Sequence, residues 1–254
     1  MTVRPALTVM LVSALLSVHG SAAATRLLGF ARDAATQRYL YTEVHDNQTT
    51  ADGALLQGQT LYYDPQGREV ARRSLDFRAN RTVPVYRLDV PGQGYSEGIT
   101  SLTPALTVFK SDQGRVERKS ITPEGELIAA DAGFNNLMLS QFRQIQAGET
   151  VRFTLVVAGR TDSFRFRARK VGEDAVNGEA AVRVKVEPDS VLRMLVEPIE
   201  LVYDAKGSRL LRYTGVSNLL DPATRQVYRK VVITYGGPVP PEAQIPGAGV
   251  PTSR

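Results

Sequence analysis

Apolar and polar residues alternate along most of the chain, and this pattern predicts β-strands with one buried face. The run RYLYTEVHD at 38–46 is typical, because successive side chains of a strand point to opposite faces. Four sequences with glycine in the fourth position, DPQG, SDQG, TPEG and DAKG, predict tight turns between such runs. We expect strands at 27–32, 38–46, 56–63, 68–77, 83–90, 95–101, 105–110, 115–121, 150–157, 163–171, 180–187, 199–203, 209–213 and 227–235.

One segment, DAGFNNLMLSQFRQIQAG at 131–148, has the period of a helix instead. Asp131 can accept hydrogen bonds from the first free N–H groups, and Gly148 can adopt the left-handed conformation that ends a helix. We therefore expect one major helix over about 131–147. Its apolar residues recur at helical spacing and share one face: Phe134, Leu137, Met138, Phe142 and Ile145.

Together these patterns predict a mainly β (α+β) fold, in which a curved antiparallel sheet or half-barrel meander packs on this helix. No linker-like sequence interrupts residues 25–235, so we expect a single β-rich domain there. Residues 236–254 are rich in proline and glycine and lack a period, which predicts a disordered tail. Residues 47–53 are polar and predict a loop, while 189–197 fit a helical turn or a buried strand.

The first 24 residues have the pattern of a secretory signal peptide. Arg4 supplies a positive start, residues 7–18 form an apolar stretch, and three alanines at 22–24 form a cleavage site. The apolar stretch is too short for a bilayer core of about 30 Å, and no cysteine follows it to carry a lipid anchor. We therefore predict an exported, periplasmic protein that is not lipidated and has no membrane span in its mature form.

Composition removes several classes of chemistry. The chain has no cysteine, which excludes disulfides, thiolate metal sites and cysteine nucleophiles. Only His45 lies outside the predicted signal peptide, so a multi-histidine metal site is excluded and a Ser–His–acid triad could use only His45. The formal net charge of +5 is modest and suits weak attraction to anionic surfaces. We predict no metal, no cofactor and no catalytic residue.

Two predicted strands concentrate basic residues on one face. Arginines alternate with apolar side chains in DSFRFRARK at 162–170, and lysine and arginine alternate with valines at 181–187. If these strands pair, they form a surface suited to lipid head groups or anionic polysaccharide. A charged outer face that keeps the sheet soluble is the simpler interpretation. The residues concerned are Arg165, Arg167, Arg169, Arg183 and Lys185.

His45 and the helix supply the other candidates. His45 shares a strand face with Glu43 and could act as a general base, although an exposed strand histidine is the simpler interpretation. The helix residues Phe134, Leu137, Met138 and Phe142 either line a lipophilic cavity between helix and sheet or pack in the core.

Three blocks of sequence resemble a family of exported proteobacterial proteins with no assigned function. The blocks are LYYDPQGREVARRSLDF at 61–77, DAGFNNLMLSQFRQIQAGETVRFTLVVAGR at 131–160 and LRMLVEPIELVYDAKGSRLLRYTGVSNLLD at 192–221. The resemblance implies no catalytic or binding residue, because none is established for that family. In architecture alone, the expected fold is similar to the half-barrel carriers that move lipoproteins across the periplasm.

These observations favour a non-enzymatic binding or carrier protein for a lipid-like or amphiphilic envelope molecule. In this hypothesis the helix face forms an apolar wall and the basic strands meet anionic head groups. A helix face packed without a cavity would contradict it. The alternative is an interaction module for another envelope protein, which would use a strand edge or the tail. A third hypothesis, a hydrolase of envelope polymers, needs a carboxylate pair in a cleft or a serine near His45. Nucleic acid is not an expected partner, since no binding motif is present.

Overall fold

A computed structural model describes residues 23–50, 55–190 and 197–246 of the 254-residue chain. Four predicted features fall partly on residues outside this part: most of the signal peptide at 1–22, the end of the loop at 51–53, most of the ambiguous segment at 191–196, and the end of the tail at 247–254. The described part of the tail follows β15, and an ion pair of 3.0 Å joins its Glu242 to Arg32.

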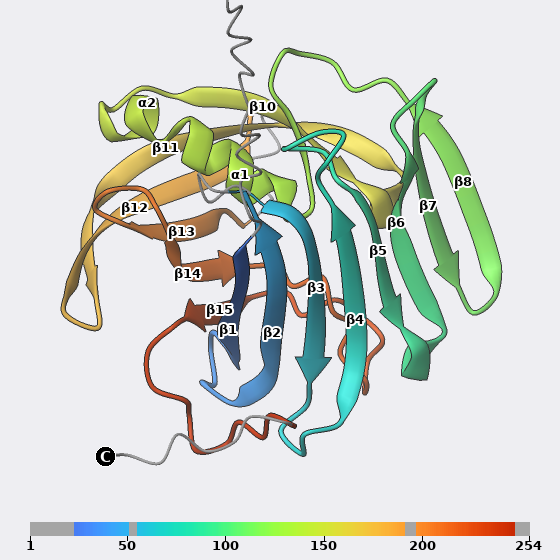
Figure 1. Cartoon of the computed structure of the whole chain (residues 1–254), viewed down its shortest axis with the longest axis horizontal. Helices are drawn as coiled ribbons and strands as arrows, with labels where there is room; N and C mark the ends of the chain where they lie inside the picture. Colours follow the sequence, from blue (N-terminus) through green and yellow to red (C-terminus); the bar gives the residue numbers. More distant parts are fainter. Residues whose placement is uncertain (1–22, 51–54, 191–196, 247–254) are drawn as a thin grey trace, which may run out of the picture.

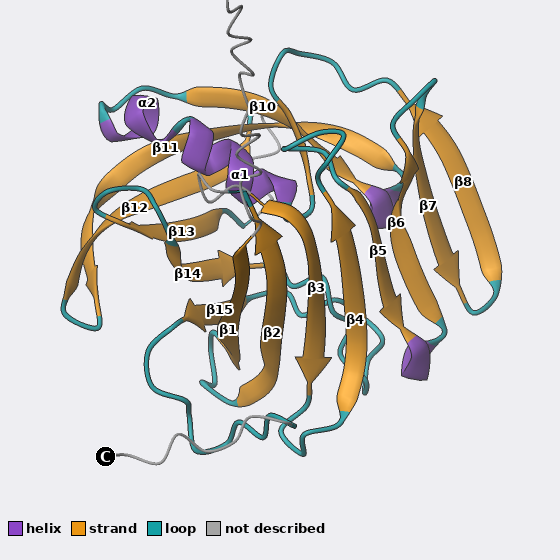
Figure 2. Ribbon diagram, viewed as in Figure 1, coloured by secondary structure: helices purple, strands orange, loops and turns teal. Residues whose placement is uncertain are grey.

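The described strands form one curved sheet that packs on a helical segment, which confirms the predicted fold class (Figures 1 and 2). Along the sheet the order is β8-β7-β6-β5-β4-β3-β2-β1-β15-β14-β13-β12-β11-β10-β9. All neighbours are antiparallel except β9 and β10. The strands of one arm are β1 (Ala23–Asp33), β2 (Tyr39–Thr49), β3 (Leu55–Tyr63), β4 (Glu69–Asp76), β5 (Val85–Val90), β6 (Tyr95–Ser101), β7 (Leu106–Asp112) and β8 (Arg115–Ile121).

The other arm begins at β15, which pairs with β1. Its strands are β9 (Ile128–Ala130), β10 (Val151–Val157), β11 (Asp162–Val176), β12 (Glu179–Pro188), β13 (Ile199–Asp204), β14 (Leu210–Gly215) and β15 (Val231–Tyr235). Two single-turn 3-10 helices, η1 (Pro91–Gln93) and η2 (Ala158–Arg160), connect strands. The predicted loop at 47–53 is partly wrong, because β2 continues to Thr49, and β15 begins at Val231 instead of Val227.

The core of the described residues forms four clusters, of which one lies under the helices and another closes the curve of the sheet. In the first, α1 and α2 pack against inward-facing residues of β10–β13. In the second, Ala130, Val156 and Ala158 from the β9–β10 end of the sheet pack against Ile99 and Val108 of β6 and β7. The two arms therefore contact one another across the inside of the half-barrel.

The single helix expected at 131–147 is divided into α1 (Gly133–Ser140) and α2 (Phe142–Gln146). Gln141 between them has non-helical dihedral angles, and the Ser140 hydroxyl donates to the Leu137 carbonyl oxygen at 2.8 Å. Such back-bonding by serine competes with the helical hydrogen bonds and accounts for the break. The chain leaves α2 through Gly148, whose φ of +89° is the predicted left-handed conformation.

Asp131 does not cap the helix as predicted. The N-cap residue of α1 is Ala132, which makes no side-chain cap, and Asp131 itself adopts a φ of +44°. Its carboxylate accepts one hydrogen bond from the Ala132 N–H group, at 2.6 Å, and otherwise turns toward β4. A buried ion pair on the sheet competes for this side chain, and the sequence pattern of the helix alone does not contain that partner.

Candidate functional site

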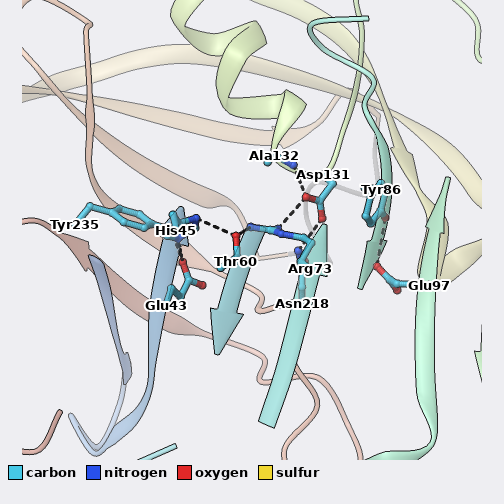
Figure 3. A network of polar contacts seen from close by, with 10 residues as sticks. All are labelled: Glu43, His45, Thr60, Arg73, Tyr86, Glu97, Asp131, Ala132, Asn218 and Tyr235. Atoms are coloured by element: carbon cyan, nitrogen blue, oxygen red, sulfur yellow. Dashed lines mark hydrogen bonds and ion pairs between the residues drawn. The ribbon is translucent and has the colours of Figure 1, made fainter. Parts of the chain in front are cut away.

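A row of polar side chains crosses the inner face of the sheet from β2 to the start of α1 (Figure 3). We call it the interior polar chain: Glu43, His45, Thr60, Arg73 and Asp131. The strand register brings its members together, because His45 lies opposite Thr60 and Thr60 lies opposite Arg73 on the next strand. Side chains opposite one another in a sheet share a face.

Arg73 and Asp131 form the centre of this chain. Arg73 Nη1 lies 2.8 Å from Asp131 Oδ1, and the two side chains are only 8% and 2% exposed. Asn218 donates to the other carboxylate oxygen at 3.2 Å, and the Arg73 guanidinium lies over the Tyr62 ring. Burial lowers the pKa of Arg73, but the nearby Asp131 carboxylate and the Tyr62 and Glu43 side chains outweigh it, so Arg73 stays charged.

One atom of Arg73 has no partner. Its Nε is buried without a hydrogen-bond acceptor among the described residues. A buried donor that makes no hydrogen bond costs about 1–3 kcal/mol, and such atoms are rare in folded proteins. The guanidinium therefore retains an unused donor on the inside of the half-barrel.

The other half of the chain joins a carboxylate, an imidazole and a hydroxyl. His45 Nε2 lies 2.8 Å from Glu43 Oε2, and Thr60 Oγ1 lies 3.1 Å from His45 Nδ1. Arg73 Nη2 donates to the Thr60 oxygen at 3.3 Å. The Glu43 carboxylate only accepts hydrogen bonds, so Nε2 of His45 donates to it. Burial raises the pKa of Glu43, but the hydrogen bond and charge of His45 outweigh it and lower the pKa.

A third carboxylate of this interior, the partly buried Glu97 on β6, lies beyond Tyr86 (Figure 3). Its Oε2 accepts a hydrogen bond of 2.5 Å from the Tyr95 hydroxyl. Gly159 of η2 packs on this oxygen so closely that an added Cβ would lie 2.1 Å from it. Burial raises the pKa of Glu97 despite the tyrosine hydrogen bonds.

Solvent has little access to this interior. Thr60, His45 and Glu43 resemble a nucleophile–base–acid row, but Thr60 is 0% exposed and its oxygen already accepts from Arg73. The interpretation of His45 as an exposed strand histidine is wrong, since its side chain is 14% exposed. Over the described ranges, no group of three or more histidine or carboxylate side chains is placed to hold a metal ion.

The predicted helix residues lie in the core. Leu137, Met138 and Phe142 are at most 4% exposed, while Phe134 is half-buried and stacks on Phe153 of β10. Two shallow hollows on the described surface lie elsewhere, beside η1 and beside the 64–67 turn. In this closed arrangement the helix face lines neither hollow, which argues against the carrier hypothesis in its original form.

The predicted pairing of the two basic strands is confirmed. β11 and β12 are antiparallel neighbours, and their apolar side chains point to the helices, so the basic ones point away from them. Arg167 and Lys185 contact the Glu187 carboxylate at 2.5 Å and 2.8 Å, and Arg169 approaches it to 4.0 Å. Hydrogen bonds from Lys185 and Arg167 hold the pKa of Glu187 at about 2. Binding of a ligand by these residues stays a prediction.

The sequence analysis did not identify Arg73 or Thr60, and it did not identify Asp131 as the ion-pair partner of Arg73. One signal was present: in the run 69–77, Ala71, Arg73, Leu75 and Phe77 alternate with polar residues, so Arg73 occupies an apolar-face position. An arginine at such a position indicates a buried charge. Its partner lies 58 residues away, and no local pattern identifies it.

In the part of the chain that the structure covers, no helix has the length and apolarity needed to cross a membrane.

Comparison with protein-family models and with curated proteins finds no match, so membership of the resembled family stays a prediction. Three solved structures match this chain over most of its length. A beta-barrel-like protein of the domain of unknown function DUF1849 from Brucella abortus is 8% identical and has a TM-score of 0.49, with 83% of this chain and 94% of that chain covered. A putative outer membrane lipoprotein-sorting protein domain from Vibrio parahaemolyticus is 11% identical, with a TM-score of 0.27 and coverage of 84% and 83%. A DUF1329 family protein from Desulfovibrio piger is 10% identical, with a TM-score of 0.23 and coverage of 86% and 85%.

Proposed function

We propose that the protein is a non-enzymatic binding protein of the cell envelope for an amphiphilic molecule with an anionic head group. The observation that carries this proposal is the Arg73–Asp131 ion pair, which ties the inner face of the sheet to the residues that precede α1. Desolvation of two buried charges offsets most of their attraction, so such a pair adds little net stability. Its place in an aromatic and aliphatic interior supports a role in binding.

The chemistry of Arg73 fits a carboxylate or a phosphate. A guanidinium presents its N–H groups as a planar fork that matches two oxygens of an anion. A head group that replaces Asp131 gains the Nη1 donor that Asp131 holds, while the unpartnered Nε lies on the other side of the guanidinium, where it forms a fork with Nη2.

The apolar part of the ligand requires movement of the helical segment. Asp131 has a positive φ at one end of this segment, and Gln141 interrupts the helix within it. Displacement of Asp131 from Arg73 would free the start of α1 and uncover Leu137 and Met138, which are fully buried in the closed arrangement. This modified carrier hypothesis keeps the helix face as the apolar wall, but only in an open state.

The test compares palmitate with hexadecanol, which has the same chain without the anionic group. The mature protein from Thr25 onward is mixed with each probe and examined by native mass spectrometry. We expect wild type to retain palmitate in preference to hexadecanol. Arg73→Met should reduce palmitate binding at least about tenfold, since the charged hydrogen bonds are worth about 1.5–3 kcal/mol.

Asp131→Asn is the matched variant on the other partner. It removes the competing charge, keeps a residue type that tolerates positive φ, and should strengthen palmitate binding. A structural role would give the opposite result, in which both substitutions lower stability and neither improves binding. Circular dichroism checks that each variant is folded. Equal retention of the two probes, or no retention by either wild type or Asp131→Asn, would overturn the proposal.

A free sheet edge supports a second candidate, the envelope interaction module. β8 ends the sheet order, and six of its seven residues are exposed. The Gln113–Gly114 turn pairs Asp112 with Arg115, so the N–H of Arg118 points outward, where an added strand would bind. The test compares two variants at this position. Arg118→Pro removes the outward N–H donor, whereas Arg118→Ser keeps it. Crosslinking in envelope extract should lose a partner with proline only; no crosslinked partner in wild type would count against this function.

A further inference from the structure

We propose that the outer face of β10–β12 is a docking surface for a membrane that contains anionic phospholipids. This inference goes beyond the interior binding site, because the residues concerned point away from the helices and the core. We call this surface the basic face; its cations are Arg152, Arg165, Arg167, Arg169, Arg183 and Lys185.

The arrangement of the basic face is costly for the protein alone. Arg152 lies directly opposite Arg167, and Arg169 lies directly opposite Lys185. Like charges directly opposite one another in a sheet are destabilising. A face that only maintained solubility would alternate the signs of its charges, so the concentration of cations indicates a partner that neutralises them.

The carboxylates on the same strands leave an excess of positive charge. Glu187 is shared by Arg167, Arg169 and Lys185, and Asp189 pairs with Arg152 at 3.2 Å. Glu200 on β13 lies opposite Lys185, whereas Asp174 and Glu179 on β11 and β12 pair with Arg212 and Arg209. Only Glu187, Asp189 and Glu200 remain to offset the six cations of the basic face, and the described residues include no ion-pair partner for Arg165 or Arg183.

The shape of the surface favours a membrane over a single polymer chain. The cations spread over three adjacent strands and, in the described structure, they line neither the hollow beside η1 nor the hollow beside the 64–67 turn. An array of this kind meets many head groups at once, and each basic residue near an anionic membrane adds about 1 kcal/mol of attraction. The shared Glu187 holds three of the cations in place before the membrane is met, which reduces the entropy lost on docking.

The experiment is flotation of the mature protein with vesicles of phosphatidylcholine, with or without phosphatidylglycerol. We expect binding only to the vesicles with phosphatidylglycerol, and loss of that binding in high salt. Arg165→Ser/Arg183→Ser removes the two cations without a described ion pair and leaves the Glu187 cluster intact. It should weaken binding about 30-fold.

The matched control is Arg115→Ser/Arg118→Ser, which removes the same charge from β8 at the other end of the sheet. It should bind nearly as well as wild type. No flotation of wild type with phosphatidylglycerol, or equal weakening by both double variants, would overturn the proposal. Binding to dextran sulfate without binding to vesicles would also overturn it and would assign the basic face to polysaccharide. Palmitate retention, which depends on Arg73, is independent of these outcomes.

Discussion

Arg73 occupies a position that the alternation of β4 assigns to the core, and its neighbours determine how the buried charge is accommodated. The guanidinium forms an ion pair with Asp131, donates a hydrogen bond to Thr60 and lies over the Tyr62 ring. Its Nε–H group has no hydrogen-bond acceptor among the described residues. On the outer face the buried charge is negative: the Glu187 carboxylate forms ion pairs with Arg167, Arg169 and Lys185. In both places one side chain organises its neighbours because burial makes unpaired charge costly.

Glu187 gives a pH dependence of stability with a definite sign. Its pKa is about 2 in the folded protein, below the ordinary value of 4.5, so it stabilises the fold above pH 4.5. That contribution, at most about 3 kcal/mol, is lost as the pH falls from 4.5 to 2. Glu187→Gln should therefore lower the free energy of unfolding at neutral pH, with the difference from wild type vanishing near pH 2. Urea denaturation across this range measures it; a difference independent of pH would contradict the assignment.

At the scale of elements, the helical segment shows how tertiary contacts modify a local pattern. Its apolar face is buried against β10–β13, as the period predicts. Its beginning is fixed by contacts that the period does not contain, namely the Arg73–Asp131 pair and the approach of Gly133 to the Thr82 carbonyl oxygen. The segment is therefore held to the sheet by apolar packing along its length and by polar contacts at its start.

Gly133→Ala separates helix propensity from this packing. Alanine is the better helix former by about 1 kcal/mol, so propensity alone predicts a more stable protein. The structure predicts the opposite, because an added Cβ would lie 2.0 Å from the Thr82 oxygen. We expect a loss of about 1–3 kcal/mol in urea denaturation. Gly92→Ala, whose Cβ would meet nothing within 4 Å, is the control and should change stability by less than about 0.5 kcal/mol.

At the scale of the whole molecule, the sheet is continuous and its two arms touch. β1 and β15 join the arms side by side, and the cluster of Ala130, Val156 and Ile99 joins them across the inside. The chain has no cysteine, so this packing stabilises the fold without disulfides. The arms share both backbone and side-chain contacts, and we expect them to unfold together.

A single unfolding transition is therefore predicted for residues 25–235. The chain has ten tyrosines and no tryptophan, so tyrosine fluorescence reports the aromatic interior, while far-ultraviolet circular dichroism reports the sheet. Both signals should give the same urea midpoint, as in a two-state transition. Separate midpoints would show that the arms are independent units and would contradict the single domain predicted from the sequence.

The candidate site was only partly predictable. The facing of Arg165, Arg167 and Arg169 away from the core follows from strict alternation, which any strand with one buried face imposes. The sequence also contained the anomaly of Arg73 on an apolar face. The pairing of Arg73 with Asp131, and of His45 with Thr60, depends on strand register and on the path of the chain after β9, and neither is a local property.

Hydrophobic periodicity and turn chemistry act between neighbouring residues, so they predict most of the strands and turns, the helical segment and the class of the fold from the sequence alone. The short strand β9 is not among the predicted strands. Only the tertiary structure decided the order of the strands in the sheet and the contact between its arms. It also decided the break at Gln141 and the burial of the interior polar chain. These features depend on contacts between residues far apart in the chain. Such contacts become favourable only once the whole sheet has formed, because the entropy of closing the long loops between them is lost first.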